Sequence, residues 1–258
     1  MRILFIGDVV GNPGRKAVRE ILPRLKMEMG IEFTVANVEN AAGGAGLTEK
    51  IVRELRDYGI DVMTGGNHTW DKREVLSFID KYEWLLRPAN YPEGVPGKGF
   101  GVYTSDTGLK VSVVNLIGRL FVGSFDCPFR KADEILKSLE PGVILVDFHA
   151  ETTSEKQALG HYLDGRVSAV IGTHTHVQTS DERILKGGTA YITDAGMSGG
   201  LYGVIGIKKE QAIDRFLYQI PQRFEPSKDM IGLEGVYLEV DPKTGKATRI
   251  ERIRRFIS

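Results

Sequence analysis

The sequence is poor in two residue types that often build small folds and catalytic sites. The chain of 258 residues has one cysteine, Cys127, and five histidines. A single cysteine excludes an internal disulfide framework and fits the reducing cytoplasm. No apolar run approaches the ~20 residues of a transmembrane helix, and the apolar start of the chain is too short for a signal peptide. We therefore expect a cytoplasmic protein without a membrane partner.

The chain also lacks an excess of charge of either sign. Its 34 Lys and Arg residues balance 34 Asp and Glu residues. Proteins that hold a nucleic-acid polymer or an anionic membrane benefit from a basic excess, so neither partner is expected. Basic residues crowd only the last predicted strand, and we interpret them as a solvated strand face. They are Arg249, Arg252, Arg254 and Arg255.

The remaining composition is that of an ordinary globular protein. Hydrophobic residues make up 41% of the chain and charged residues 26%. At this length a folded chain buries roughly 75% of its unfolded surface, so neither disulfides nor a structural metal are needed for stability. Glycine is abundant, with 31 residues.

Apolar runs alternate with amphipathic stretches, which predicts an α/β fold with parallel strands early and a mixed sheet later. Strands are predicted at 3–6, 33–38, 61–64, 143–148, 167–171, 236–240 and 248–253, and a hairpin turns at 106–108. Helices are predicted from Pro13, after a Thr48 cap, from a capping box of Asp71 and Glu74, at 131–139, from Ser154 and at 208–219.

Two of these helices carry a more detailed expectation. Pro23 predicts a kink or a break in the first helix. The last helix is expected to turn its apolar residues inward. These are Ala212, Ile213, Phe216 and Leu217. No linker or repeat divides the chain, so we expect one domain over 1–258.

Polar residues follow five of the predicted strands. In open α/β sheets, ligands bind in the turns at the carboxyl ends of the strands. If the strands are parallel neighbours, these side chains converge at one edge, and nearby glycines allow the backbone to turn sharply there. The residues are Asp8, Glu39, Asn40, Asn67, His68, His149, His174 and His176.

Taken singly, most of these residues have an ordinary explanation. Asp8 could cap the following helix, Glu39-Asn40 could be turn chemistry, and His149 could be a hydrogen-bonded core histidine. The pair His174-x-His176 is more specific, because two imidazoles that alternate in an extended segment can address one site. The joint occurrence of all these residues at five strand ends favours a shared site.

Carboxylates, carboxamides and imidazoles without a thiolate suit borderline divalent ions such as manganese, iron or zinc. Without His68, seven candidate ligands remain. Seven ligands are too many for one tetrahedral zinc ion and fit two ions that share a bridge. Two ions roughly 3.5–4 Å apart are a recurrent solution for the hydrolysis of phosphate esters.

The same strings carry a resemblance to known families. Gly66-Asn67-His68, His149 and His174-x-His176 resemble the calcineurin-like metallophosphoesterase superfamily. Longer strings resemble the YmdB-like bacterial cyclic-nucleotide phosphodiesterases. They are Ile6-Gly7-Asp8-Val9-Val10-Gly11, Glu39-Asn40-Ala41-Ala42-Gly43-Gly44, Gly66-Asn67-His68-Thr69-Trp70 and Asp194-Ala195-Gly196-Met197. The resemblance implies a metallophosphoesterase-type sandwich of two mixed β-sheets flanked by helices.

Two departures from the wider superfamily are shared by the YmdB-like branch. Val10 stands where the superfamily has a histidine, and Glu39-Asn40 replaces a metal-bridging aspartate. The resemblance implies that Glu39 bridges two divalent ions, with iron or manganese favoured over zinc. It assigns Asp8, Asn40 and His176 to one ion and Asn67, His149 and His174 to the other.

The resemblance also makes His68 the general acid. An imidazole beside a ligand can hold a proton near pH 7 and give it to a leaving oxygen, although His68 could instead orient the Asn67 amide. The implied reaction is hydrolysis of 2′,3′-cyclic nucleotides, with 3′,5′-cyclic nucleotides as further candidates, by a metal-bound hydroxide. The alternatives are a phosphomonoesterase or nucleotidase with the same site, and a catalytically silent regulatory scaffold. The family also implies a homo-oligomer.

Other residues are given no catalytic role. His161 is expected on the surface, and Cys127 lacks the neighbours that activate a nucleophile. The loop at 88–101 and the stretch at 197–206 could border the substrate, and Tyr202 could stack on its base.

Overall fold

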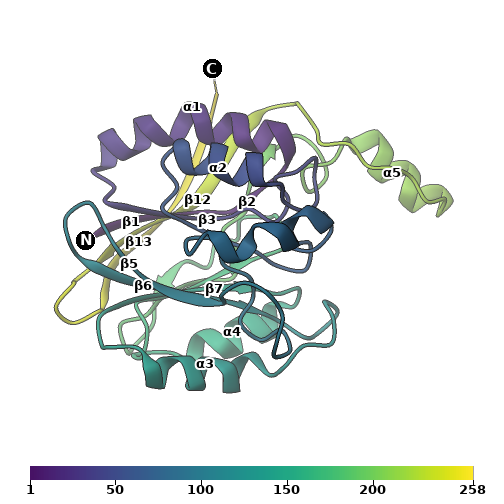
Figure 1. Ribbon diagram of the computed structural model, residues 1–258. Coiled ribbons are helices and arrows are strands. Elements are labelled where there is room, and N and C mark those ends of the chain that lie inside the picture. Colours follow the sequence, from purple (N-terminus) through teal and green to yellow (C-terminus); the bar gives the residue numbers. More distant parts are fainter. Residues whose placement is uncertain (258) are drawn as a thin grey trace.

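The structure is a computed structural model and describes residues 1–257. Two mixed β-sheets pack face to face, and helices cover their outer faces (Figure 1). This confirms the expected α/β sandwich of two mixed sheets. The helices are α1 (Gly11–Met29), α2 (Glu49–Asp57), α3 (Pro128–Ser138), α4 (Thr153–Tyr162) and α5 (Lys209–Tyr218).

The first sheet holds seven strands in the order β2-β11-β12-β1-β3-β4, with β13 paired to β12. Their bounds are β1 (Arg2–Ile6), β2 (Asp8–Val9), β3 (Phe33–Asn37), β4 (Val62–Thr64), β11 (Met197–Gly200), β12 (Ile231–Val240) and β13 (Ala247–Phe256). The strands β1, β3 and β4 are parallel neighbours, whereas β12 runs antiparallel to β1.

The second sheet holds six strands in the order β5-β6-β7-β8-β10-β9. Their bounds are β5 (Phe100–Thr104), β6 (Lys110–Ile117), β7 (Val143–His149), β8 (Ala169–Thr173), β9 (Arg183–Ile184) and β10 (Ala190–Ile192). The expected hairpin is the antiparallel pair of β5 and β6, and β6, β7, β8 and β10 are parallel.

Alternation along the strands decides which residues enter which core. On β1, Leu4 and Ile6 pack under helices α1 and α2, whereas Ile3 and Phe5 face the second sheet. All four side chains are fully buried, because both faces of β1 are covered. Burial on both faces explains why the parallel strands read as continuous apolar runs in the sequence.

Helix α1 runs without a break through Pro23. The prediction of a break at Pro23 is wrong. Ile21, Leu22 and Leu25 are buried on either side of the proline, and this packing maintains a helix that the missing N–H would weaken. The helix ends at Gly30, where a φ of 61° allows the glycine N–H to bond the Lys26 carbonyl.

The helix predicted from the capping box of Asp71 and Glu74 does not form. Two 3₁₀ turns, Arg73–Ser77 and Ile79–Lys81, take its place. Both acidic side chains are engaged elsewhere. Asp71 lies 2.8 Å from Nδ1 of His68, and Glu74 accepts the N–H of Glu49 at 3.0 Å.

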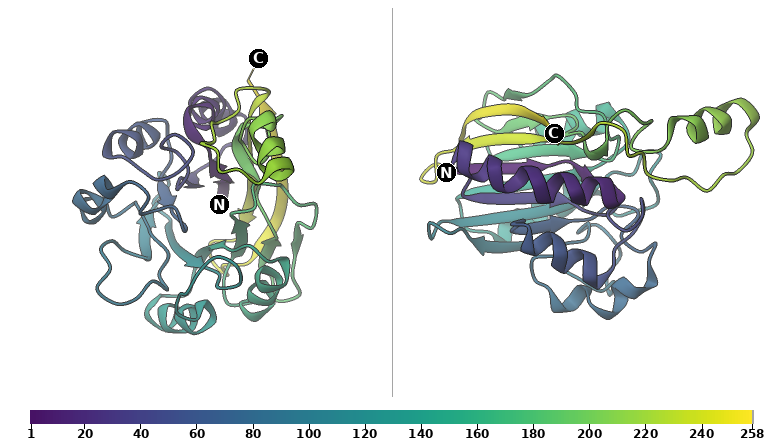
Figure 2. Two further views of the ribbon diagram at one scale, coloured as in Figure 1. Left: turned by 90° about the vertical axis from the view of Figure 1, so that its right-hand side faces the viewer. Right: turned by 90° about the horizontal axis from the view of Figure 1, so that it is seen from above.

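Helix α5 forms where expected but does not face the interior. Ala212 is buried, whereas Ile213 is 51% exposed, Phe216 80% and Leu217 67%. The helix stands on an arm that projects from the sandwich (Figures 1 and 2). The periodic pattern correctly indicated an amphipathic helix, but no other segment of residues 1–257 covers its apolar face.

None of the helices within residues 1–257 is both long enough and apolar enough to span a membrane.

Candidate metal centre and active site

The eight polar residues predicted at strand ends come together at one end of the sandwich. The parallel strands β1, β3 and β4 of the first sheet and β7 and β8 of the second lead into them. The N–H of His174 donates to Oδ2 of Asp8 at 3.0 Å, and Asn67 lies 2.9 Å from His149. These contacts show that the strand ends of the two sheets meet.

A first group of side chains surrounds the Asn40 carboxamide. Its Nδ2 lies 3.4 Å from Oδ1 of Asp8 and 3.2 Å from Nε2 of His176. Nδ1 of His176 bonds the carbonyl of Ile205 at 2.9 Å, which directs Nε2 towards the group. Asp8 does not cap α1, because the N-cap is Val10 and has no side-chain bond.

A second group surrounds the buried ring of His149. Its Nε2 lies 2.9 Å from Oδ1 of Asn67, and its ring centroid lies 4.6 Å from that of His174. Glu39 connects the two groups, since its Oε1 is 3.1 Å from Nε2 of His149 and 3.4 Å from Nδ2 of Asn40. Glu39 therefore occupies the position that a bridging ligand needs.

The donor atoms of this cluster fit divalent ions. Ligand atoms of Glu39, His149 and His174 lie within 4.8 Å of one another. Buried carboxylates and imidazoles in one cluster are the ligands that zinc, iron and manganese use in proteins. A Cβ at Gly66 would lie 2.4 Å from Oε2 of Glu39 and 2.4 Å from Nε2 of His149, so only glycine leaves space for these ligand atoms.

Charges in the cluster balance one another. Burial opposes the ionisation of Asp8 and Glu39, but attraction to His176 and His149 outweighs it and lowers the pKa of both carboxyls. Against the effect of its own burial, His176 has its pKa raised to about 9 by Asp8. Burial and repulsion by His149 lower the pKa of His174 to about 4. Attraction between the buried carboxylates and the imidazoles of His149 and His176 thus favours opposite charges across the cluster.

His68 lies at the edge of the cluster. Its backbone N–H donates to Oε2 of Glu39 at 2.7 Å, and its Nδ1 lies 2.8 Å from the Asp71 carboxylate. Among residues 1–257 no hydrogen bond joins the ring to the Asn67 amide. The sequence pattern assigned Asp71 to helix capping, whereas the structure uses it to orient His68.

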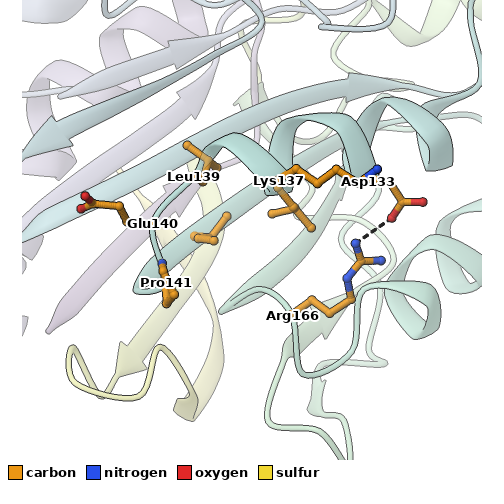
Figure 3. A pocket seen from close by; sticks show the side chains of 8 residues that line it. Asp133, Lys137, Leu139, Glu140, Pro141 and Arg166 are labelled. Carbon is orange, nitrogen blue, oxygen red and sulfur yellow. Dashed lines mark hydrogen bonds and ion pairs between the residues drawn. The ribbon is translucent and has the colours of Figure 1, made fainter.

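These residues open into a pocket of about 400 Å³, lined by His68, His174 and His176 at one end. A separate pocket beside α3 is bordered by the Asp133–Arg166 ion pair and contains none of the predicted site residues (Figure 3). The pocket at the strand ends is therefore the candidate active site.

Comparison with known proteins agrees with this geometry. The sequence profile described as YmdB-like protein matches residues 4–253. A Bacillus subtilis protein named 2′,3′-cyclic-nucleotide 2′-phosphodiesterase is 54% identical over 255 residues, covering 98% of this chain and 96% of the relative. The chain belongs to the YmdB-like family.

Two solved structures share the fold of this YmdB-like chain. A hypothetical protein from Thermus thermophilus superposes with a TM-score of 0.93 at 42% identity, covering 99% of both chains. A protein of Mycoplasma pneumoniae described as a novel phosphatase also has a TM-score of 0.93, at 36% identity, and the alignment covers 99% of this chain and 93% of that one.

Polar residues behind the YmdB-like site position His149, and sequence reasoning gave them no role. Nδ1 of His149 lies 3.0 Å from the hydroxyl of Thr173, which donates to Asp147 at 2.7 Å. Asn37 donates to the same Asp147 carboxylate at 3.1 Å and so links the two sheets. Burial raises the pKa of Asp147 to about 6. Their positions in the sequence could have indicated this role, because Asn37 ends β3 and Asp147 lies two residues before His149.

A buried ion pair holds the turn that carries His174 and His176. Asp194 lies 2.8 Å from Nζ of Lys156 and accepts the N–H of Thr175 at 3.1 Å. Both histidines have positive φ, 98° at His174 and 61° at His176, a conformation that non-glycine residues seldom adopt. The contacts to Asp194 stabilise this strained turn.

Residues without an assigned catalytic role lie outside the pocket. His161 is exposed on α4, as expected, and Cys127 is partly exposed at the start of α3. The four arginines of β13 are exposed on the strand face, and Arg249, Arg252 and Arg254 pair with glutamates.

The segments expected to border the substrate contribute little to the pocket. Nζ of Lys209 lies 4.6 Å from the ring centroid of Tyr202, and Tyr202 lines neighbouring pockets instead. Ile205 is the residue of the stretch 197–206 that lines the 400 Å³ pocket, and none of residues 88–101, all described, does so.

Gly66→Ala tests whether the cluster depends on this glycine. The added Cβ would meet Glu39 and His149, so we expect a folded protein that binds divalent ions at least about tenfold more weakly. Binding is measured by titrating chelator-treated protein with Mn²⁺. Asp133→Asn is the control, because the Asp133 carboxylate pairs with Arg166 beside α3 and contributes nothing to the cluster. Equal Mn²⁺ affinity of wild type and Gly66→Ala would show that the glycine does not protect the ligand atoms.

Proposed function

We propose that this chain hydrolyses nucleoside 2′,3′-cyclic monophosphates in the cytoplasm. The observation that supports this most strongly is the convergence of the seven candidate ligands in one cluster, which opens through Glu39, Asn40, His174 and His176 into a pocket that His68 also lines. The assignment of the chain as a phosphodiesterase rests on its family and on the Bacillus relative that is 54% identical to it. The single cysteine and balanced charge support the cytoplasmic location and a small substrate.

The proposed cofactors are two divalent ions, with iron or manganese favoured and zinc as the alternative. Glu39 would bridge the ions. Asp8, Asn40 and His176 would hold one of them, and Asn67, His149 and His174 would hold the other. Such ions, when bound, activate a water molecule and neutralise the oxygens of the phosphate.

His68 would act on the leaving oxygen. Its Nδ1 bonds Asp71, which leaves Nε2 available to a substrate in the pocket. As a water oxygen bonds to phosphorus and the bond from phosphorus to the ribose oxygen breaks, a proton on Nε2 would pass to the ribose oxygen, which leaves a nucleoside monophosphate. The Asp71 carboxylate stabilises the protonated ring before transfer and keeps its orientation afterwards.

A phosphomonoesterase is the second candidate function. It is supported by the Mycoplasma pneumoniae structure, which is described as a phosphatase and has a TM-score of 0.93. The same cluster would bind a terminal phosphate, so the substrate must be compared directly.

The first experiment compares Mn²⁺-loaded wild type with His68→Ala on 2′,3′-cyclic AMP, 3′,5′-cyclic AMP and 3′-AMP. We expect wild type to open the 2′,3′-cyclic phosphate fastest. His68→Ala should lose about 10²–10⁴-fold in kcat, the usual contribution of a general acid. Products are separated by chromatography. His161→Ala is the control, because His161 is exposed on α4.

Two outcomes contradict the proposal. Undiminished turnover by His68→Ala would remove this residue from the mechanism. Faster release of phosphate from 3′-AMP than opening of the cyclic nucleotide would favour the phosphomonoesterase.

A second experiment tests the metals by thermal unfolding. A ligand present at 100 times its Kd stabilises a protein by about 2.7 kcal/mol, so Mn²⁺ should raise the Tm of chelator-treated wild type by several degrees. Asp8→Asn removes a buried carboxylate and should abolish most of this shift. The control Asp133→Asn changes a carboxylate that pairs with Arg166 beside α3 and should keep it. An equal shift in Asp8→Asn would argue against Asp8 as a ligand.

We also propose that two copies of the chain pair through α5. Its exposed apolar side chains continue at Ile220, which is 62% exposed, and the arm holds them away from the sandwich. Two identical apolar helix faces can cover each other in one symmetric contact. Sedimentation should show more than 28.6 kDa for wild type and about that mass for Phe216→Asp. A monomeric wild type would refute the pairing.

A further inference from the structure

The candidate active-site pocket extends beyond the histidines to a wall formed by the segment after α5. Arg223, Phe224, Glu225 and Pro226 line this wall. Beside this wall, the pocket is lined by small residues of the turn after β3, the turn that also carries the candidate ligands Glu39 and Asn40. They are Ala42, Gly43, Gly44 and Ala45. These two segments together line the part of the pocket beyond the candidate ligands, which is called the second compartment below.

The wall is anchored to the segment just before α5 and to the start of α1. The N–H of Ser227 donates to the carbonyl of Gly206 at 2.8 Å, and the N–H of Lys208 donates to the carbonyl of Glu225 at 3.0 Å. Pro226 packs against Gly11, where a Cβ would lie 2.8 Å from its Cγ. Phe224 thus lies two residues before an anchored proline, in a wall held on both sides.

Phe224 is the aromatic side chain available in the second compartment. Within residues 1–257, it supplies the one aromatic ring of the pocket lining besides the imidazoles. The ring is 41% exposed, so a face remains open to a ligand. Tyr202, the residue that the sequence suggested for stacking, lines other pockets.

The dimensions and chemistry of the second compartment suit a nucleobase. The whole pocket of about 400 Å³ lies within the usual range for sites that bind small molecules. The glycine and alanine residues of the lining leave room for a flat group, and the aromatic ring of Phe224 can stack on it. The other groups that line the wall, Arg223 and Glu225, are exposed and carry charge.

We propose that Phe224 stacks on the base of the cyclic nucleotide while its phosphate lies at the metal cluster. The inference rests on the proposed phosphodiesterase function and names the residue that recognises the nucleoside. Because every base has a π-face, stacking on Phe224 tolerates different bases. Phe224 binds the base in the substrate and in the transition state alike, so it lowers KM and leaves kcat unchanged.

The test compares 2′,3′-cyclic AMP with glycerol 1,2-cyclic phosphate, a five-membered cyclic phosphodiester without a base. Phe224→Ala should lower kcat/KM for the nucleotide about tenfold, through KM, and leave the rate on the base-free substrate unchanged. Phe224→Trp should retain the wild-type KM. Phe121→Ala is the matched control, because Phe121 is 91% exposed and lies outside the pocket.

The outcomes separate this inference from the proposed function. If wild type opens neither cyclic phosphate, the proposed function fails. If wild type opens both and Phe224→Ala loses activity equally on both, Phe224 supports the site and does not recognise the base, which overturns the inference. Unchanged kinetics of Phe224→Ala on both substrates would overturn it as well.

Discussion

The rest of the structure depends on the burial of two carboxylates, Asp8 and Glu39, at the junction of the two sheets. Both are fully buried, and an isolated buried carboxylate is strongly unfavourable. The imidazoles of His149 and His176 lie 3.1 Å from Glu39 and 3.6 Å from Asp8, and bound divalent ions would supply compensating charge. The cluster is therefore stable only when carboxylates and cationic partners are present together.

The sandwich brings these partners within reach of each other. The first sheet provides Asp8, Glu39 and Asn40 on its strand ends, and the second provides His149 and His174. A layer of polar contacts behind the cluster keeps the sheets in register there, as when Asn37 of β3 bonds Asp147 of β7. Site and fold thus share the same contacts.

The segment that returns from α5 connects the projecting arm to the pocket. This segment forms one wall of the pocket and is hydrogen-bonded to Gly206 and Lys208, just before the helix. The arm and the wall therefore form one unit. A contact made by the apolar face of α5 therefore lies close in the chain to the residues that receive the substrate.

The order of residues along the chain was sufficient to predict the five helices, nine of the thirteen strands of residues 1–257 and the eight strand-end side chains that converge at the candidate site. Strand alternation and the turns after strand ends are local properties, so they can be read from neighbouring residues. The sequence did not reveal that Asp71 orients His68, that Asp194 and Lys156 hold the turn of His174, or that α5 leaves the core. Each of these depends on which distant segment lies opposite. The packing of the two sheets decides which segments lie opposite each other, because a side chain can bond or pack only against the partners that the fold places beside it.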